Sequence, residues 1–167
     1  RHNVLNALAA AAAALAAGAV PAQVKQGLEA MQSVRGRLQA KPGLYGARVI
    51  DDTYNANPAS FAAAIHVLAQ QPDKRWLVLG DMGELGADAP ALHAQVGKTA
   101  RDAGIDRLYA VGPLSQAAVQ AFGPGGVHRA DQGALVMALQ SALAETQDKV
   151  TLLVKGSRSA HMETVVA

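Results

Sequence analysis

The chain contains no cysteine among its 167 residues, so it forms no disulfide bond and offers neither a thiolate metal ligand nor a cysteine nucleophile. Aromatic residues make up only 4% of the sequence, which argues against the base-stacking platforms of proteins that bind single strands. Lys and Arg number 15 against 13 Asp and Glu, and the net charge of +2 lacks the basic excess of a duplex-binding protein. We therefore expect no nucleic-acid partner. The absence of cysteine fits a reducing, cytoplasmic setting.

Long apolar runs are also missing, apart from an alanine-rich opening that Asn6 and Gly18 interrupt. Its Leu and Val residues stand at positions 4, 5, 8 and 15, a helical stripe that predicts a packed helix rather than a membrane span. The segment lacks the processing region typical of a signal peptide. We expect a monomer with no membrane partner. Because the first residue is Arg rather than Met, we interpret the chain as a piece of a longer protein.

The pattern of apolar residues divides the chain into two parts. Helices are predicted over residues 2–18 and 21–32, and the turn-rich stretch 35–43 is typical of a linker. Beyond it, short apolar runs alternate with amphipathic segments. The predicted strands are 48–51, 76–79, 108–111, 127–128 and 150–154, and the predicted helices are 58–70, 89–103, 114–122 and 132–145. This alternation predicts an α/β fold, with a Rossmann-like, mostly parallel sheet and helices on both faces.

The most polar stretch is Asp51-Asp52-Thr53-Tyr54-Asn55-Ala56-Asn57-Pro58, where the first of these strands gives way to a helix. Ligands of parallel sheets bind at the carboxyl ends of the strands, and a carboxylate such as Asp52 accepts hydrogen bonds from sugar hydroxyls there. Asn57 precedes Pro58 and is also a good helix N-cap, while Asp51 has the alternative of capping the strand end. The binding and the capping interpretations both stay open at this point.

Two glycine-containing loops follow other predicted strands. In Lys155-Gly156-Ser157-Arg158 the glycine permits a tight turn, and Lys155 and Ser157 offer a charge and a hydroxyl to a small carboxylate; a solvated basic turn is the alternative. The loop 80–86 has the spacing G-x-x-G-x-x-G instead of G-x-G-x-x-G, which argues against a nicotinamide-dependent oxidoreductase. The five histidines share no ligand spacing, so we predict no metal site in this chain.

Four motifs, in order along the chain, resemble those of the Mur ligase family. They are Arg1-His2-Asn3-Val4-Leu5-Asn6-Ala7-Leu8, the octapeptide 51–58, Gly80-Asp81-Met82-Gly83-Glu84-Leu85-Gly86 and Val154-Lys155-Gly156-Ser157-Arg158. The resemblance implies a three-domain enzyme, with residues 1–42 closing its central ATP-binding domain and residues 43–167 forming its Rossmann-like C-terminal domain. It implies an ATP-dependent ligase that forms an amide bond through an acyl phosphate. The octapeptide is similar to that of the family member that adds D-alanyl-D-alanine to UDP-MurNAc-tripeptide in peptidoglycan precursor synthesis.

The resemblance also implies roles for individual residues. Arg37 matches a catalytic arginine that reaches the γ-phosphate of ATP, a task suited to an always-charged planar fork. Asn3 and Asn6 match amides that face the adenine from one side of a helix, and Asp52 matches an acid that binds the ribose. The whole set implied for nucleotide binding is Asn3, Asn6, Arg37, Asp52, Tyr54, Asn55 and Asn57. The set implied for binding D-alanyl-D-alanine is Asp81, Glu84, Lys155, Ser157 and Arg158.

The sequence lacks the G-x-x-x-x-G-K-[ST] loop that cradles a nucleoside triphosphate. We therefore expect this loop and the Mg²⁺ ligands in a missing part of the enzyme, and we expect this chain alone to be inactive. A non-catalytic receiver-type signalling domain is the alternative from a different class, because Asp51, Asp52 and Lys155 mimic its acids and lysine. Its phosphoacceptor is missing, since the corresponding position reads Val111-Gly112-Pro113.

Overall fold

The computed structural model describes residues 2–31 and 34–167 and divides the chain into two compact units, 1–33 and 34–167. The first unit contains helices α1 (His2–Ala16) and α2 (Pro21–Glu29), which contact each other. Pro21 opens α2 at the first helical position, where its missing N–H costs nothing. The apolar stripe of α1 is exposed within this unit, with Val4, Leu5 and Leu8 each at least 60% accessible. The packing expected of this stripe is therefore not found within the described residues.

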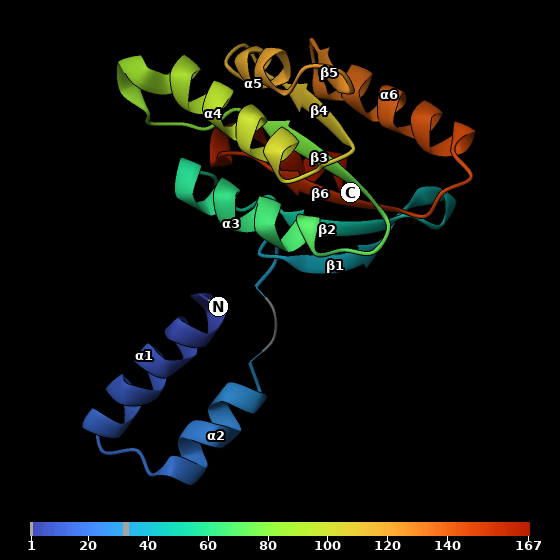
Figure 1. The fold of residues 1–167 in the computed structure, drawn as a ribbon. Helices are drawn as coiled ribbons and strands as arrows, with labels where there is room; N and C mark the ends of the chain where they lie inside the picture. The colour runs from blue at the N-terminus through green and yellow to red at the C-terminus, as the bar shows by residue number, and fades with distance from the viewer. Residues whose placement is uncertain (1, 32–33) are drawn as a thin grey trace. The chain divides into compact units, whose positions relative to one another are not determined.

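The second unit is built on a six-stranded sheet in the order β1-β2-β6-β3-β4-β5 (Figure 1). Its strands are β1 (Gln39–Pro42), β2 (Arg48–Asp52), β3 (Lys74–Gly80), β4 (Arg107–Val111), β5 (Gly126–Arg129) and β6 (Val150–Lys155). All neighbouring pairs are parallel except β1 and β2, which are antiparallel. The five strands expected from the sequence are present as β2 to β6, and the α/β fold with a mostly parallel sheet is confirmed.

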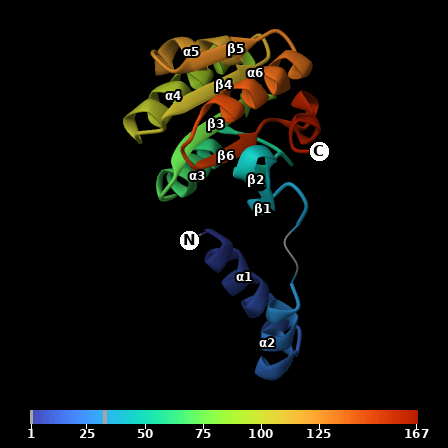
Figure 2. The same ribbon diagram turned by 90° about the vertical axis from the view of Figure 1, so that its right-hand side faces the viewer.

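Helices cover both faces of this sheet (Figures 1 and 2). The helices are α3 (Pro58–Ala69), α4 (Ala89–Asp102), α5 (Ser115–Phe122) and α6 (Gln132–Glu145). One apolar core joins α3, α4 and α5 to the strands through residues such as Phe61, Leu77 and Leu153. A second core joins α6 to the opposite face through residues such as Trp76, Leu139 and Val154. Because β6 is covered on both faces, all six of its residues are buried, as a central parallel strand requires.

The edge strand β1 lies where the sequence pattern indicated a linker. Gln39–Pro42 contains no β-branched or aromatic residue, so local propensity gave no strand signal. The strand forms because β2 offers an unpaired edge, and Lys41 donates to the buried Asp51 across the pair at 2.6 Å. Pro42 is tolerated on an edge strand, where one side needs no partner. The second unit consequently begins at residue 34, and the domain boundary expected at 42/43 falls inside it.

The chain ends in two short 3₁₀ helices, η3 (Arg158–Ala160) and η4 (Met162–Val165), which the sequence pattern did not predict. Met162 is fully buried, and its side chain packs over the carboxyl ends of β3 and β6. A Cβ atom at Gly80 would lie 2.7 Å from Met162 Cγ, and one at Gly156 would lie 2.6 Å from it. Both glycines therefore provide the space that this side chain fills.

Candidate functional site

The carboxyl ends of β2, β6 and β3 meet at one edge of the sheet, as the parallel topology predicts. In the register of the sheet, Asp52 of β2 is the partner of Lys155 of β6, and Lys155 in turn is the partner of Leu79 of β3. The octapeptide 51–58 and the loops that begin at Gly80 and Gly156 therefore leave the sheet side by side. This edge is the candidate functional site.

Lys155 and Asp52 form a nearly buried ion pair at this edge. Lys155 Nζ lies 2.6 Å from Asp52 Oδ2 and donates a second hydrogen bond to the carbonyl oxygen of Asn55 at 2.9 Å. The Lys155 side chain is 3% exposed and that of Asp52 is 14% exposed. The ammonium group thus faces Asp52 and the Asn55 carbonyl, whereas the sequence interpretation had Lys155 offer its charge to a small carboxylate or lie in a solvated turn. The two residues lie 103 positions apart, and the sequence pattern groups them only in the receiver-type alternative, without pairing them.

Asp51 has a structural role beside this pair. Its carboxylate accepts hydrogen bonds from Lys41 Nζ at 2.6 Å and from the backbone N–H and hydroxyl of Thr53 at 3.2 and 2.7 Å. Burial alone would raise the pKa of Asp51, but the hydrogen bonds from Lys41 and Thr53 outweigh it and hold the pKa below its ordinary value. Asp51 therefore stays ionised and joins β1 to β2.

The backbone on both sides of Arg37 is bound to the octapeptide. The Tyr54 N–H donates to the carbonyl oxygen of Gly36 at 3.0 Å, and the Leu38 N–H donates to Asp52 Oδ1 at 3.2 Å. Gly36 has a φ of +72°, and a Cβ there would lie 3.0 Å from the Tyr54 nitrogen, so this close approach requires glycine. The structure thus holds the backbone on both sides of Arg37 against Asp52 and Tyr54, through contacts that the sequence did not reveal.

Two guanidinium groups lie near the ring of Tyr54, which is 45% exposed. The Arg37 guanidinium carbon is 4.4 Å from the ring centroid and that of Arg158 is 5.8 Å from it, both within cation–π range. Among the described residues neither arginine forms an ion pair. Two positive charges at a strand end, neither of them in an ion pair within the described residues, favour binding of an anion.

The two asparagines of the octapeptide are exposed, and their side-chain oxygens accept hydrogen bonds from nearby backbone N–H groups. Asn57 caps α3, because its side-chain oxygen accepts from the Ser60 N–H at 2.8 Å while the Ser60 hydroxyl accepts from the Asn57 N–H at 2.9 Å. The side-chain oxygen of Asn55 accepts from the Ala56 N–H at 2.8 Å. The capping interpretation of Asn57 is therefore confirmed, and its amide NH₂ group remains on the surface of the site.

Asp81, which follows β3, holds the start of α5. Its carboxylate accepts hydrogen bonds from the Leu114 N–H at 3.3 Å and from the Ser115 N–H at 2.8 Å, and it also accepts from the Ser115 hydroxyl. Its carbonyl oxygen accepts from the Ser157 N–H at 2.9 Å. Asp81 therefore fixes two neighbouring loops, a role that the sequence interpretation, which aimed it at an ammonium group, had not included. Glu84 is exposed, with a φ of +60°.

The loop after β3 is also held by His93, a fully buried residue of α4. His93 Nδ1 donates to the Ala89 carbonyl oxygen at 2.7 Å, and Nε2 accepts from the Met82 N–H at 2.9 Å. These partners require the neutral imidazole protonated at Nδ1. His93 is therefore a support for this loop, with no ring nitrogen left for a ligand.

The loop after β6 contains Ser157 and Arg158. Ser157 is buried, and its hydroxyl lies 3.1 Å from that of Ser159. A pocket of about 320 Å³ opens beside this loop, at the carboxyl ends of β3 and β4 and the start of α6. Its lining includes Asp81, Gly112, Asp131, Gln132 and Ser159. Of the acceptor residues expected from the sequence, Asp81 lines this pocket, Lys155 and Ser157 are buried, and Glu84 and Arg158 are exposed.

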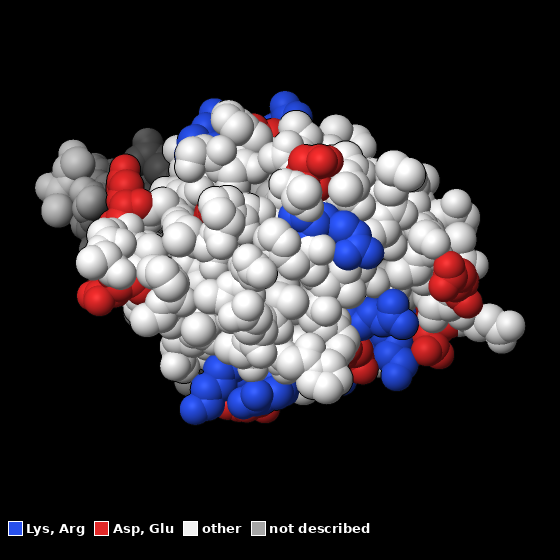
Figure 3. Space-filling view, turned by 90° about the horizontal axis from the view of Figure 1, so that it is seen from above, with Lys and Arg blue, Asp and Glu red and all other residues white. Residues whose placement is uncertain are grey.

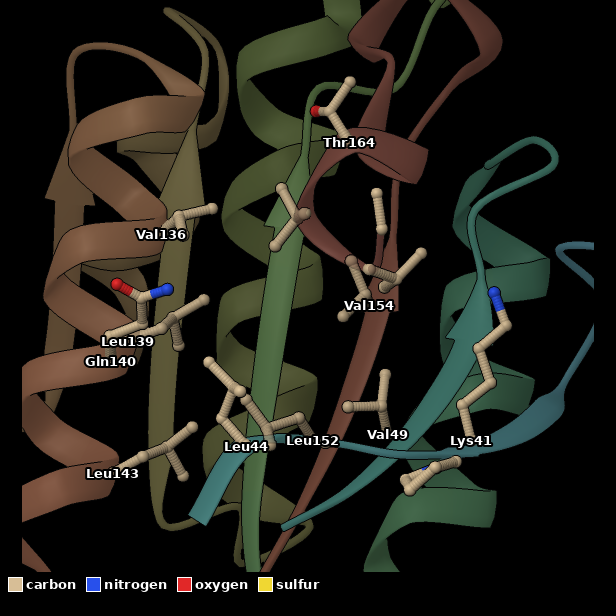
Figure 4. A pocket seen from close by; sticks show the side chains of 15 residues that line it. Lys41, Leu44, Val49, Val136, Leu139, Gln140, Leu143, Leu152, Val154 and Thr164 are labelled. Atoms are coloured by element: carbon tan, nitrogen blue, oxygen red, sulfur yellow. The ribbon is translucent and has the colours of Figure 1, made fainter. Parts of the chain in front are cut away.

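A second pocket of about 410 Å³ lies on the face of the sheet that α6 covers (Figure 4). Aliphatic side chains from α6, β2, β6 and the end of the chain line most of it, among them Val49, Leu139 and Val154. Lys41 lies at its edge and is paired with Asp51. Because its lining offers few polar groups, this pocket is part of the packing between layers and lies apart from the candidate site.

Helix α1 carries the two residues expected to face adenine. Asn6 is exposed on α1, and the side chain of Asn3 lies outside the described part of the structure.

Within residues 2–31 and 34–167, no group of three or more His, Asp or Glu side chains comes together as a metal site would require. None of the helices in these ranges is long and apolar enough to cross a membrane. On the face shown in Figure 3, basic side chains lie in separate groups, with acidic side chains beside most of them.

The family profile described as "Mur ligase, glutamate ligase domain" matches residues 36–158, a range that contains the candidate site. The chain belongs to the Mur ligase family. The UDP-N-acetylmuramoyl-tripeptide–D-alanyl-D-alanine ligase of Escherichia coli K12 is 49% identical over 166 residues, which cover 99% of this chain and 36% of that protein. The ligase of the same name from Haemophilus influenzae is 41% identical over 172 residues, with the same coverage of 99% and 36%.

Solved Mur ligase structures agree with the fold. A crystal structure of MurF from Acinetobacter baumannii matches with a TM-score of 0.88 and 37% identity, covering 99% of this chain and 36% of that chain. MurF ligase from Thermotoga maritima in complex with ADP matches with a TM-score of 0.70 and 25% identity, covering 82% of this chain and 31% of that chain. This chain therefore spans about 36% of the length of the ligases that it matches. The receiver-type alternative is not supported.

Proposed function

We propose that this chain is the C-terminal part of an ATP-dependent ligase that adds D-alanyl-D-alanine to UDP-MurNAc-tripeptide. The observation that carries the proposal is the 49% identity to a ligase of that name over nearly the whole chain, and the fold agrees with it. The 4.4 Å approach of the Arg37 guanidinium to the Tyr54 ring, beside the bond from the Leu38 N–H to Asp52, supports a phosphate-binding role for Arg37 at the strand ends. We expect the enzyme to act in the cytoplasm as a monomer.

The residues present fit an anionic nucleotide substrate. Arg37 supplies a fork of donors to the γ-phosphoryl group, which gains charge as the tripeptide carboxylate attacks phosphorus and ADP leaves. The amine of D-alanyl-D-alanine then attacks the acyl carbon and phosphate leaves. The nucleotide would also meet Asn3, Asn6, Asp52, Tyr54, Asn55 and Asn57. Mg²⁺ would neutralise the phosphates and take its ligands, like the triphosphate loop, from a part of the enzyme outside this chain.

The dipeptide would bind where the loops after β3 and β6 meet. The pocket of about 320 Å³ beside Asp81 and Ser159 has room for a small peptide, and Arg158 offers a charge to a carboxylate nearby. Glu84 and Ser157 belong to the same pair of loops. The ammonium group of Lys155 is already paired with Asp52, so Lys155 would contribute to the dipeptide site indirectly, by holding the end of β2.

The proposal is tested with the full-length protein, by measuring phosphate release from ATP. Release should require both UDP-MurNAc-tripeptide and D-alanyl-D-alanine, and Arg37→Ala should lower kcat by about 100-fold or more. Arg35→Ala is the matched control, because Arg35 is exposed on the same segment and should leave kcat near the wild-type value. Release at the same rate without the dipeptide, or a silent Arg37→Ala, would contradict the proposal.

The role of Asp52 is tested with Asp52→Asn. The amide oxygen can still accept from Leu38 N–H, but the charge that would hold the ribose hydroxyls and pair with Lys155 is lost. The KM for ATP should therefore rise by a larger factor than kcat falls. An unchanged dependence on ATP concentration would remove Asp52 from the nucleotide site.

A further inference from the structure

Hydrogen bonds fix the backbone of the segment that carries Arg37, whereas the side chain of Arg37 is exposed. Its neighbours Gly36 and Leu38 are each hydrogen-bonded to the end of β2, so the Cα atom of Arg37 has a defined place. The guanidinium lies at the end of a long flexible side chain, and holding it in one orientation costs rotamer entropy. Within the described residues no acid holds this group. The contact that the structure does give it is the ring of Tyr54, 4.4 Å away.

We propose that Tyr54 is a positioning residue, whose ring holds the Arg37 guanidinium in the orientation that phosphoryl transfer needs. The proposal rests on the proposed function, because that function gives Arg37 its task. An aromatic face suits this purpose, since it attracts a guanidinium without neutralising it and leaves all five N–H donors free for the phosphate. A carboxylate in the same place would occupy donors and reduce the charge that the transferring group meets.

The ring is well placed to act as a rigid support. Tyr54 follows Asp52 by two residues, and its own N–H is bound to Gly36, so the ring and the Arg37 backbone belong to one fixed unit. Arg158 reaches the same ring from the loop after β6, at 5.8 Å. Tyr54 therefore links the Arg37 segment to the loop that we propose for the dipeptide. The aromatic face carries this role, and the phenol hydroxyl is not needed for it.

The kinetic test compares Tyr54→Leu with Tyr54→Phe in the full-length enzyme. Tyr54→Leu removes the aromatic face, and we expect kcat to fall by about tenfold, a larger factor than any rise in the KM for ATP. Tyr54→Phe keeps the face and should restore most of the lost turnover. In an Arg37→Ala background the change from Tyr to Leu should have almost no further effect, because the group that it positions is gone.

Tyr45→Leu is the matched control. Tyr45 is another exposed tyrosine, 67% accessible, but it precedes β2 whereas Tyr54 follows it, and the strand separates the two. Its substitution should leave kcat and KM at their wild-type values. A Tyr54→Leu variant that raises the KM for ATP with unchanged kcat would overturn the proposal, because the ring would then serve nucleotide binding alone and not the orientation of Arg37. Equal losses from Tyr54→Leu with and without Arg37 would also overturn it.

A measurement on the 167-residue protein separates this proposal from the proposed function. The ring current of Tyr54 should shift the NMR signals of the Arg37 Cδ and Nε protons upfield. The shift should persist in Tyr54→Phe and disappear in Tyr54→Leu. Arg37 signals that are identical in the wild type and Tyr54→Leu would refute the contact itself. If the contact is present and the full-length wild type shows no dipeptide-dependent phosphate release, the ligase assignment fails and the ring is still shown to position Arg37.

Discussion

Lys155 on β6 and Asp52 at the end of β2 are joined by a 2.6 Å ion pair that is almost completely shielded from solvent. Asp52 also accepts from the Leu38 N–H, and Lys155 also donates to the Asn55 carbonyl. One pair of charges therefore ties together two strands, the octapeptide and the segment that carries Arg37. Asp52, which the family resemblance implies for nucleotide binding, is therefore held by Lys155, which the resemblance implies for dipeptide binding.

Removing one partner of this pair should destabilise the fold. Lys155→Met leaves the partly buried Asp52 without its counter-charge, and we expect the free energy of unfolding to fall by about 3 kcal/mol. Urea denaturation of this chain measures the change. Lys74→Met is the control, because the Lys74–Asp106 pair spans 3.7 Å with Lys74 half exposed and should cost less than about 1 kcal/mol. Equal costs for the two variants would show that the buried pair contributes no more than a surface one.

Asp51 should make stability depend on pH in the acid range. Its pKa is lowered in the folded protein, so its contribution is fully present above the ordinary Asp pKa of about 3.9 and is lost as the pH falls through the lower folded value. Asp51→Asn should therefore flatten the decline of unfolding free energy on acidification below about pH 4. Asp88→Asn serves for comparison, since Asp88 is exposed and makes no capping hydrogen bond. The same slope in Asp51→Asn and the wild type would exclude this linkage.

His93 should stabilise the loop after β3 through its two hydrogen bonds. His93→Ala leaves the Met82 N–H without its partner in a buried site, while the Ala89 carbonyl keeps its helical bond from the N–H of residue 93, and the expected cost is about 1–3 kcal/mol. His66→Ala removes an exposed imidazole bound to Gln70 and should change stability by less than about 0.5 kcal/mol. Hydrogen exchange of the Met82 amide gives a local readout, and unchanged protection in His93→Ala would contradict the assigned role.

Gly156 and Met162 should be energetically coupled. Gly156→Ala places a Cβ atom 2.6 Å from Met162 Cγ, and the overpacking should cost about 1–3 kcal/mol. In a Met162→Ala background the same substitution should cost less, because the long side chain is gone. A double-mutant cycle of unfolding free energies measures the difference. Additive costs would mean that Ala160 and the backbone of Gly80, rather than Met162, limit the space at Gly156.

The alternation of apolar runs predicted five strands and the helices between them because β3 and β6, covered on both faces, carry uninterrupted apolar residues. It missed β1, since Gln39–Pro42 becomes a strand only by pairing with β2, which local propensity does not register. The octapeptide located the site for a similar reason, as the ends of parallel strands meet at one edge. The partners of Lys155, Asp81 and His93 escaped prediction, because each is a contact between segments far apart in the sequence.

The route by which the chain enters the sheet has a mechanical consequence. After residue 34 the polypeptide touches the end of β2 through Gly36 and Leu38 before it turns back as β1. Any pull or twist transmitted along the backbone from preceding residues thus arrives first at Arg37 and its anchors, ahead of the hydrophobic interior. The peptide bonds on either side of Arg37 therefore both connect this unit to the preceding residues and form part of its candidate site.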